Sequence, residues 1–216
     1  MSDATPNNFR GITAGIIAAL PLYIIGAAAM DPIMHLYAAA LVLDGIAEGL
    51  AVDSDALAEL EGQGRGAMMR AAGLTYAALI VAPIDFAHLH ITDGYDVWLR
   101  FSALAVAVFG MALRVWAMQV NPFFTPFTTI QTEREHRVVD LGPYRLVRHP
   151  GDLGAILTIV AGQIALNSGI SAAIAAVAAI IVVHQVIDED RFLTDHLDGF
   201  KEYSLRVPYR LVPPFA

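Results

Sequence analysis

The sequence predicts an all-α protein, a polytopic bundle of five or six transmembrane helices. Apolar residues make up 56% of the 216 positions and charged residues 16%, which is far more apolar than a typical soluble domain. Several apolar runs reach the ~20 residues that a helix needs to cross about 30 Å of hydrocarbon. Two of these runs follow each other so closely near the C-terminus that they predict a helical hairpin.

The charge balance and the residue types exclude several classes of function. The formal net charge is -8, so the chain lacks the basic surface that binding to nucleic acid requires. Cysteine is absent, which excludes disulfides, thiolate nucleophiles and cysteine-based zinc sites. His88 and His90 are two residues apart and would not share a helix face, so we expect no metal site there.

Residues 1–120 form the first of two expected regions, and their four apolar runs cover residues 11–30, 33–52, 66–87 and 97–120. The first run is long for a signal peptide, so we expect it to stay attached as a span. Asp44 and Glu48 lie one helical turn apart in the second run. They face either the bundle interior and its mouth or a solvated rim. Residues 53–65 are polar and acidic, and predict a short amphipathic helix or loop.

Basic residues predict the orientation of the spans. Arginine and lysine are concentrated in two polar segments, residues 121–152 and 188–216, which we therefore expect on the cytoplasmic side. If Arg10 is also cytoplasmic, it lies on the same side of the membrane as these segments. The number of spans between it and the C-terminal segment must then be even, which gives six. Because Arg10 is a single basic residue, six spans are favoured over five by only a small margin.

The second region, residues 121–216, contains the apolar runs 153–166 and 170–187, separated by three polar or small residues. A single helix over the whole block would be about 50 Å long, which is too long for one crossing at modest tilt. A tight hairpin with small residues at its helix contact fits better. The hairpin returns the chain to its starting side, so we expect His149 at its entrance to meet Glu189 at its exit.

The stretch that enters the hairpin is rich in residues that suit a charged ligand. Residues 142–154 read G-P-Y-R-L-V-R-H-P-G-D-L-G. Pro150 disfavours the α region for His149 and so restricts where the imidazole can point. Arg145 and Arg148 add two permanent cations, each able to grip a carboxylate in a bidentate fork. Such a cluster beside an apolar segment suits a ligand that is charged at one end and held next to lipid.

In this order around a hairpin, the residues resemble the isoprenylcysteine carboxyl methyltransferase family, which is grouped with the phospholipid methyltransferases. The usual family pattern is R-H-P-x-Y-x-G, then a hydrophobic hairpin, then E-E-x-x-L. Here Arg148-His149-Pro150 and Gly154 precede the hairpin, and Glu189-Asp190 and Leu193 follow it. The resemblance spans roughly residues 121–213.

The resemblance implies methyl transfer from S-adenosylmethionine, on the cytoplasmic side, to a lipophilic acceptor that enters from the bilayer. The acceptor would be an isoprenylcysteine-like carboxylate, a lipid amine or a small hydrophobic thiol. Residues 121–216 would be the catalytic region with its cytoplasmic cofactor pocket, and residues 1–120 the membrane part on the acceptor side. The implied catalytic residues are Glu189 and Arg148, and the implied cofactor-binding residues are Tyr144, Arg148, His149, Pro150, Leu153, Glu189, Asp190, Tyr203 and Arg210.

Individual roles follow from the chemistry of these side chains. Arg148 would bind the methionine carboxylate of the cofactor. Glu189 or Asp190 would take the amino group or ribose hydroxyls, or withdraw a proton from an amine or thiol acceptor. The chain departs from the family pattern at two positions. Asp152 stands where the family has tyrosine, and Asp190 replaces the second glutamate.

Other interpretations of the same residues stay open at this point. Arg145, Arg148 and Glu189 could form a salt-bridge network that only anchors the hairpin, and His149 could be a structural residue of the turn. A membrane reductase of the sterol type is similar in placing R-H-P before a hairpin, but it binds NADPH. A non-catalytic membrane protein could keep the same scaffold.

Overall fold

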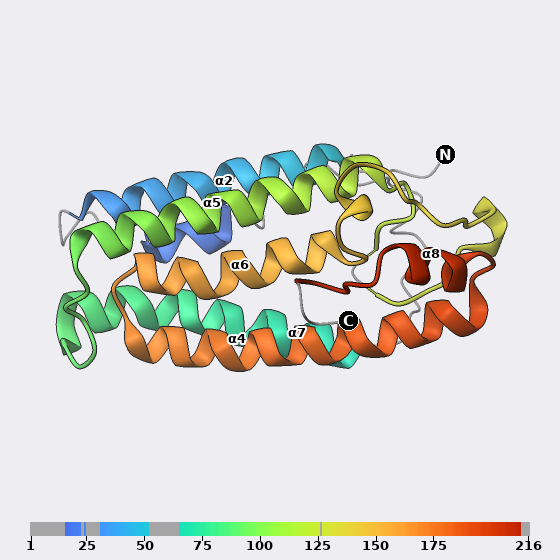
Figure 1. Cartoon of the computed structure of the whole chain (residues 1–216). Coiled ribbons are helices and arrows are strands. Elements are labelled where there is room, and N and C mark those ends of the chain that lie inside the picture. Colours follow the sequence, from blue (N-terminus) through green and yellow to red (C-terminus); the bar gives the residue numbers. More distant parts are fainter. Residues whose placement is uncertain (1–15, 23, 25–30, 52–64, 126, 213–216) are drawn as a thin grey trace, which may run out of the picture.

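The described part of the molecule is an elongated bundle of helices (Figure 1). The computed structural model describes residues 16–22, 24, 31–51, 65–125 and 127–212. The predicted all-α class is confirmed. The α-helices are α2 (Pro32–Ala51), α4 (Arg65–Ile84), α5 (Val97–Val120), α6 (Pro150–Ala165), α7 (Gly169–His196) and α8 (Phe200–Arg206). A π-helical turn, η1 (Asp85–Leu89), continues α4, and two 3-10 turns, η2 (Thr132–Arg134) and η3 (Gly142–Arg145), lie between α5 and α6.

Among the described residues, four helices are long and apolar enough to cross a membrane: α2, α4 with η1, α5 and α7. Helix α6 has 16 residues and is shorter than a full crossing. The predicted first span, residues 11–30, lies outside the described residues except for 16–22 and 24, which are helical. The predicted segment 53–65 also lies outside them, apart from Arg65. A multi-pass membrane protein is therefore supported, and the choice between five and six spans stays a prediction.

Helices α6 and α7 form the predicted hairpin. Its turn contains Asn167 in the left-handed conformation, with φ 61. The hydroxyl of Ser168 then caps α7 by accepting the backbone N–H of Ser171 at 3.3 Å. Asn167 Oδ1 also accepts the backbone N–H groups of Gly94 and Tyr95, at 3.1 and 2.8 Å. The turn is thereby tied to the connection between η1 and α5, at the opposite end of the bundle from α8 (Figure 1).

Helices α5 and α6 approach each other through small residues. A methyl group on Gly110 would lie 2.6 Å from the carbonyl oxygen of Gly154, and one on Gly154 would lie 2.5 Å from that of Gly110. The hydroxyl of Thr158 donates to the carbonyl of Ala107 at 3.3 Å. Glycine at both positions lets the two backbones touch, as in many membrane helix pairs. This contact places the start of α6 against α5.

The acids of α2 face the bundle, as the inward-facing interpretation predicted. Glu48 Oε1 accepts a hydrogen bond from Nε of Arg114, on α5, at 2.5 Å. Asp44, one turn earlier, lines a mostly apolar groove between α2 and α5 together with Leu43 and Trp116. Glu48 is therefore paired with α5, although its side chain stays 28% exposed.

Most of the irregular chain gathers at one end of the bundle. The segment 121–149 and α8 lie together there, beside the start of α6 (Figure 1). Helix α7 continues past its predicted span, residues 170–187, and ends only at His196. This extension carries the acidic run of residues 188–190 to the end where the hairpin begins.

Candidate functional site

The entrance and the exit of the hairpin meet at Asp190. Its Oδ1 accepts a hydrogen bond from Nε of Arg148 at 2.7 Å and lies 3.2 Å from Nε2 of His149. Its Oδ2 accepts from Nη2 of Arg148 and from Nε of Arg210, both at 2.9 Å. Asp190, Arg148 and His149 are buried. The two ends of the hairpin therefore meet, but the acid that His149 contacts is Asp190, whereas the predicted partner, Glu189, lines the adjacent cavity.

Backbone hydrogen bonds add the C-terminal segment to this junction. The N–H groups of Arg148 and His149 donate to the carbonyls of Tyr209 and Arg210, at 2.9 Å each. Pro150 occupies the first turn of α6, where its missing N–H costs nothing. His149 precedes it with φ -123 and ψ 62, outside the α region, as predicted for a residue before proline.

The guanidinium of Arg148 uses three of its five N–H donors inside the protein. Besides its two bonds to Asp190, it donates from Nη1 to the carbonyl of Val207 at 2.7 Å. A buried arginine with a bidentate carboxylate partner is a neutralised pair. A ligand carboxylate would have to bind to the remaining N–H groups, one on Nη1 and one on Nη2. The contacts of Arg148 therefore match the interpretation in which this arginine holds the hairpin ends together.

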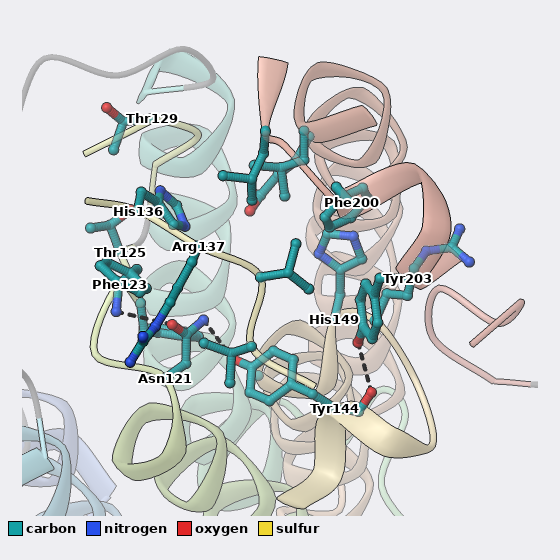
Figure 2. A pocket seen from close by; sticks show the side chains of 18 of the residues that line it. Asn121, Phe123, Thr125, Thr129, His136, Arg137, Tyr144, His149, Phe200 and Tyr203 are labelled. Carbon is teal, nitrogen blue, oxygen red and sulfur yellow. Dashed lines mark hydrogen bonds between the residues drawn. The ribbon is translucent and has the colours of Figure 1, made fainter. Parts of the chain in front are cut away.

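A cavity lies beside this junction, with about 680 Å³ of space between its walls, including the part that is open to solvent. One wall comes from the segment between α5 and α6, and the other from α7, α8 and the start of α6 (Figure 2). It is lined by Asn121, Phe123, Phe124, Thr125, Phe127, Thr129, His136, Arg137, Val138, Val139, Tyr144, Arg148, His149, Gly151, Asp152, Glu189, Leu193, Leu197, Phe200 and Tyr203.

The predicted cofactor-binding residues fall into three groups. Those that line the cavity are Tyr144, Arg148, His149, Glu189 and Tyr203. Asp190 and Arg210 line a second groove on the other side of Arg148. Pro150 and Leu153 line neither space. Leu153 packs instead against a hydrophobic cluster that includes Ala71 of α4 and Val182 of α7.

Two buried tyrosines hold the wall of the cavity in place. The hydroxyl of Tyr203, on α8, donates to the carbonyl of Tyr144 at 2.6 Å (Figure 2). The hydroxyl of Tyr144 accepts from Nδ2 of Asn121 at 3.2 Å. Burial raises the pKa of both phenols, so they stay neutral. The two tyrosine side chains therefore connect α8, η3 and the end of α5 through hydrogen bonds.

The cavity contains two carboxylates with few protein partners. Glu189 Oε2 lies 3.4 Å from the hydroxyl of Thr128, a long hydrogen bond. Asp152 Oδ2 lies 3.9 Å from Nδ1 of His149. Burial of His149 disfavours its charged form, but the hydrogen bond to Asp190 and the nearby carboxylates outweigh this effect and raise its pKa. The cavity thus places acids around one imidazole that is readily protonated.

Comparison with known proteins agrees with this geometry. Residues 103–195 match the model of the Isoprenylcysteine carboxyl methyltransferase (ICMT) family. Over these residues the chain is similar to that family. A relative, Protein-S-isoprenylcysteine O-methyltransferase B of Arabidopsis thaliana, is 30% identical over 114 residues. That match covers 51% of this chain and 58% of the relative, so the two correspond over only about half of their lengths.

The part that is similar to the isoprenylcysteine carboxyl methyltransferase family includes most of the cavity. It contains the whole segment between α5 and α6, the hairpin entrance and the acids of α7. Tyr203 and Arg210, which complete the junction from the C-terminal side, lie beyond the matched residues. Asp152, which stands where this family usually has tyrosine, lines the same cavity as Glu189.

Half of the cavity lining comes from a segment that the sequence assigns to the pocket but in which it identifies no individual site residue. This segment, residues 121–139, reads in sequence as a polar connection. A signal is present, because Phe123, Phe124 and Phe127 cluster just after an apolar span, where a solvated loop would have few aromatic residues. His136 and Arg137 follow in the same segment and also line the cavity.

Proposed function

We propose that this chain is an integral membrane methyltransferase that transfers a methyl group from S-adenosylmethionine to a lipophilic acceptor. The observation that carries the proposal is the cavity at the end of the bundle, closed by the hairpin ends within the family region. The four membrane-length helices of the described residues, which lie beside it, fit an acceptor that arrives from the bilayer. The concentration of the arginine and lysine residues of the chain in the flanking segments supports a cytoplasmic cavity.

The residues around the cavity fit the chemical groups of the cofactor. S-adenosylmethionine combines an aromatic base, ribose hydroxyls, a sulfonium cation and an amino acid end. Phenylalanine rings of the segment 121–139 suit the base and the cation, because aromatic faces attract both. The carboxylates of Glu189 and Asp152 suit the ammonium group, the hydroxyls and the positive sulfur.

The carboxylate of the cofactor requires a cation, and Arg137 can provide it. Arg137 lines the cavity and is exposed, whereas Arg148 is buried and bonded to Asp190 and Val207. Among the described residues, none forms an ion pair with Arg137. In this proposal Arg137 meets the carboxylate first. The predicted contact of Arg148 with that carboxylate would then use its remaining N–H groups.

The chain would act mainly by alignment and by excluding water. The bound cofactor supplies a methyl group that is transferred by in-line displacement. Holding donor and acceptor in line can contribute about 7 to 11 kcal/mol. Glu189 faces the cavity with only the long bond from Thr128, so it can take a proton from an amine or thiol acceptor. A carboxyl acceptor, which the name of the family specifies, would need no base.

Isothermal titration of the detergent-purified protein with S-adenosylhomocysteine tests the proposal. We expect saturable binding, and no binding of NADPH, whose phosphates would meet the carboxylates of Glu189 and Asp152. Binding of NADPH alone would favour a membrane reductase. Failure of both ligands to bind would indicate a protein that keeps the scaffold without the activity. Vesicles that carry an isoprenylcysteine-like carboxylate, a lipid amine or a hydrophobic thiol then identify the acceptor by methyl incorporation.

A further inference from the structure

The imidazole ring of His136 lies on the wall of the cavity opposite α7 and α8 (Figure 2). Its ring stacks on that of Phe123, with the centroids 4.5 Å apart and the planes at 23°. Phe123 is itself fixed, because its carbonyl accepts from Nε2 of the buried Gln131 at 2.9 Å. The guanidinium of Arg134 lies 5.7 Å from the centre of the Phe123 ring. The position of His136 is therefore set by packing within its own segment.

A backbone hydrogen bond determines which nitrogen of His136 carries the proton. The N–H of Gln131 donates to Nδ1 of His136 at 3.3 Å. A backbone N–H can only donate, so Nδ1 must present its lone pair and the proton of the neutral ring must be on Nε2. The backbone N–H of His136 also donates to the carbonyl of Gln131, at 3.2 Å, which keeps the ring and the turn together.

The ring is neutral at physiological pH. Burial and the nearby cation of Arg134 lower the pKa of His136 to about 4. Nε2 therefore offers an uncharged N–H donor, and no acceptor for it is found among the described residues. A polar donor at the edge of a cavity with no protein acceptor is available to a ligand.

We propose that His136 donates a hydrogen bond from Nε2 to a ring nitrogen of the adenine of the cofactor. This inference rests on the proposed function. The surroundings favour the base over the other end of the cofactor, because Phe124 and Phe127, from the same segment as His136, also line the cavity and can pack on an aromatic ring. An uncharged donor matches an uncharged ring nitrogen, whereas Arg137 is the better partner for a carboxylate.

Three substitutions separate the donor from the stacking. His136→Phe keeps an aromatic ring on Phe123 but removes the donor. In His136→Gln the side-chain amide can reach the position of Nε2, and in His136→Asn it can reach only that of Nδ1. We expect His136→Phe and His136→Asn to bind S-adenosylhomocysteine about tenfold more weakly than the natural protein, and His136→Gln to bind within about threefold of it. Equal affinity in all three variants would overturn the proposal.

Analogues of the ligand test the same bond without relying on how the variants fold. The 1-deaza, 3-deaza and 7-deaza forms of S-adenosylhomocysteine each lack one ring nitrogen. We expect one of them to bind the natural protein about tenfold more weakly, and we expect His136→Phe to lose that discrimination. If none is weakened, or if the weakened analogue is discriminated equally by His136→Phe, the proposal is wrong. If S-adenosylhomocysteine itself does not bind the natural protein, the proposed function has failed first.

Discussion

Replacement of Asp190 by asparagine tests whether the ion cluster holds the hairpin ends together. The side chain of Asp190 is 5% exposed and that of Arg148 is 4% exposed. The substitution keeps the size of the side chain but leaves a buried guanidinium without a counter-charge. Breaking a buried ion pair by removing one partner costs about 3 to 5 kcal/mol. For a protein of this length each kcal/mol corresponds to roughly 2 to 4 °C, so we expect a loss of roughly 6 to 20 °C in Tm.

Thermal unfolding in a single detergent measures this effect. Asp188→Asn is the matched control, because Asp188 lies on the same helix but pairs with Arg191 at 3.7 Å, with both side chains more than two-thirds exposed. An exposed ion pair of this kind contributes little to stability, so the control variant should have the same Tm as the natural protein. If Asp190→Asn and Asp188→Asn have the same Tm, the buried ion cluster does not stabilise the junction of the hairpin ends, and the argument is refuted.

Three further predictions concern the cavity and the bundle. Glu189→Gln should weaken binding of S-adenosylhomocysteine about tenfold by titration while leaving Tm unchanged, and undiminished affinity would remove this acid from the site. Gly110→Ala should destabilise the bundle by about 1 to 3 kcal/mol in thermal unfolding, since its methyl group would lie 2.6 Å from a backbone oxygen, whereas Gly73→Ala meets nothing within 4 Å and should not. The pKa of His149 is raised in the folded protein, so its contribution to stability is full below about pH 6.5 and is lost as the pH rises through the folded pKa. A Tm that is flat between about pH 6 and pH 9 would contradict this sign.

The hairpin could be predicted because its signals are strong and local. A proline after His149, two apolar runs and an acidic exit leave few other ways to place residues 142–190 in a bilayer. The meeting of Arg148 with Asp190 follows from this topology. Sequence could not show that the pair is bidentate and buried, because that depends on the C-terminal segment that covers it.

The segment 121–139 is the main part of the site in which the sequence identifies no individual residue. Its folded shape depends on side-chain contacts inside the segment, such as that of Gln131 with the carbonyl of Phe123. Such contacts have no fixed spacing and therefore leave no periodic pattern.

For Leu153, in contrast, the sequence implied a role in the site. Its place in the motif implied a cofactor contact, but as part of α6 it faces a hydrophobic cluster with α4 and α7.

The two adjacent acids of α7 have different surroundings for a geometric reason. Successive residues of a helix point about 100° apart, so Glu189 and Asp190 cannot face the same space. Asp190 faces the junction, where Arg148 and Arg210 neutralise it, and Glu189 faces the cavity with only a long bond from Thr128. The chain differs from the family pattern at Asp190, the acid with the structural contacts. The shorter of the two acids therefore lies in the ion cluster with Arg148 and Arg210, and the longer one lines the cavity.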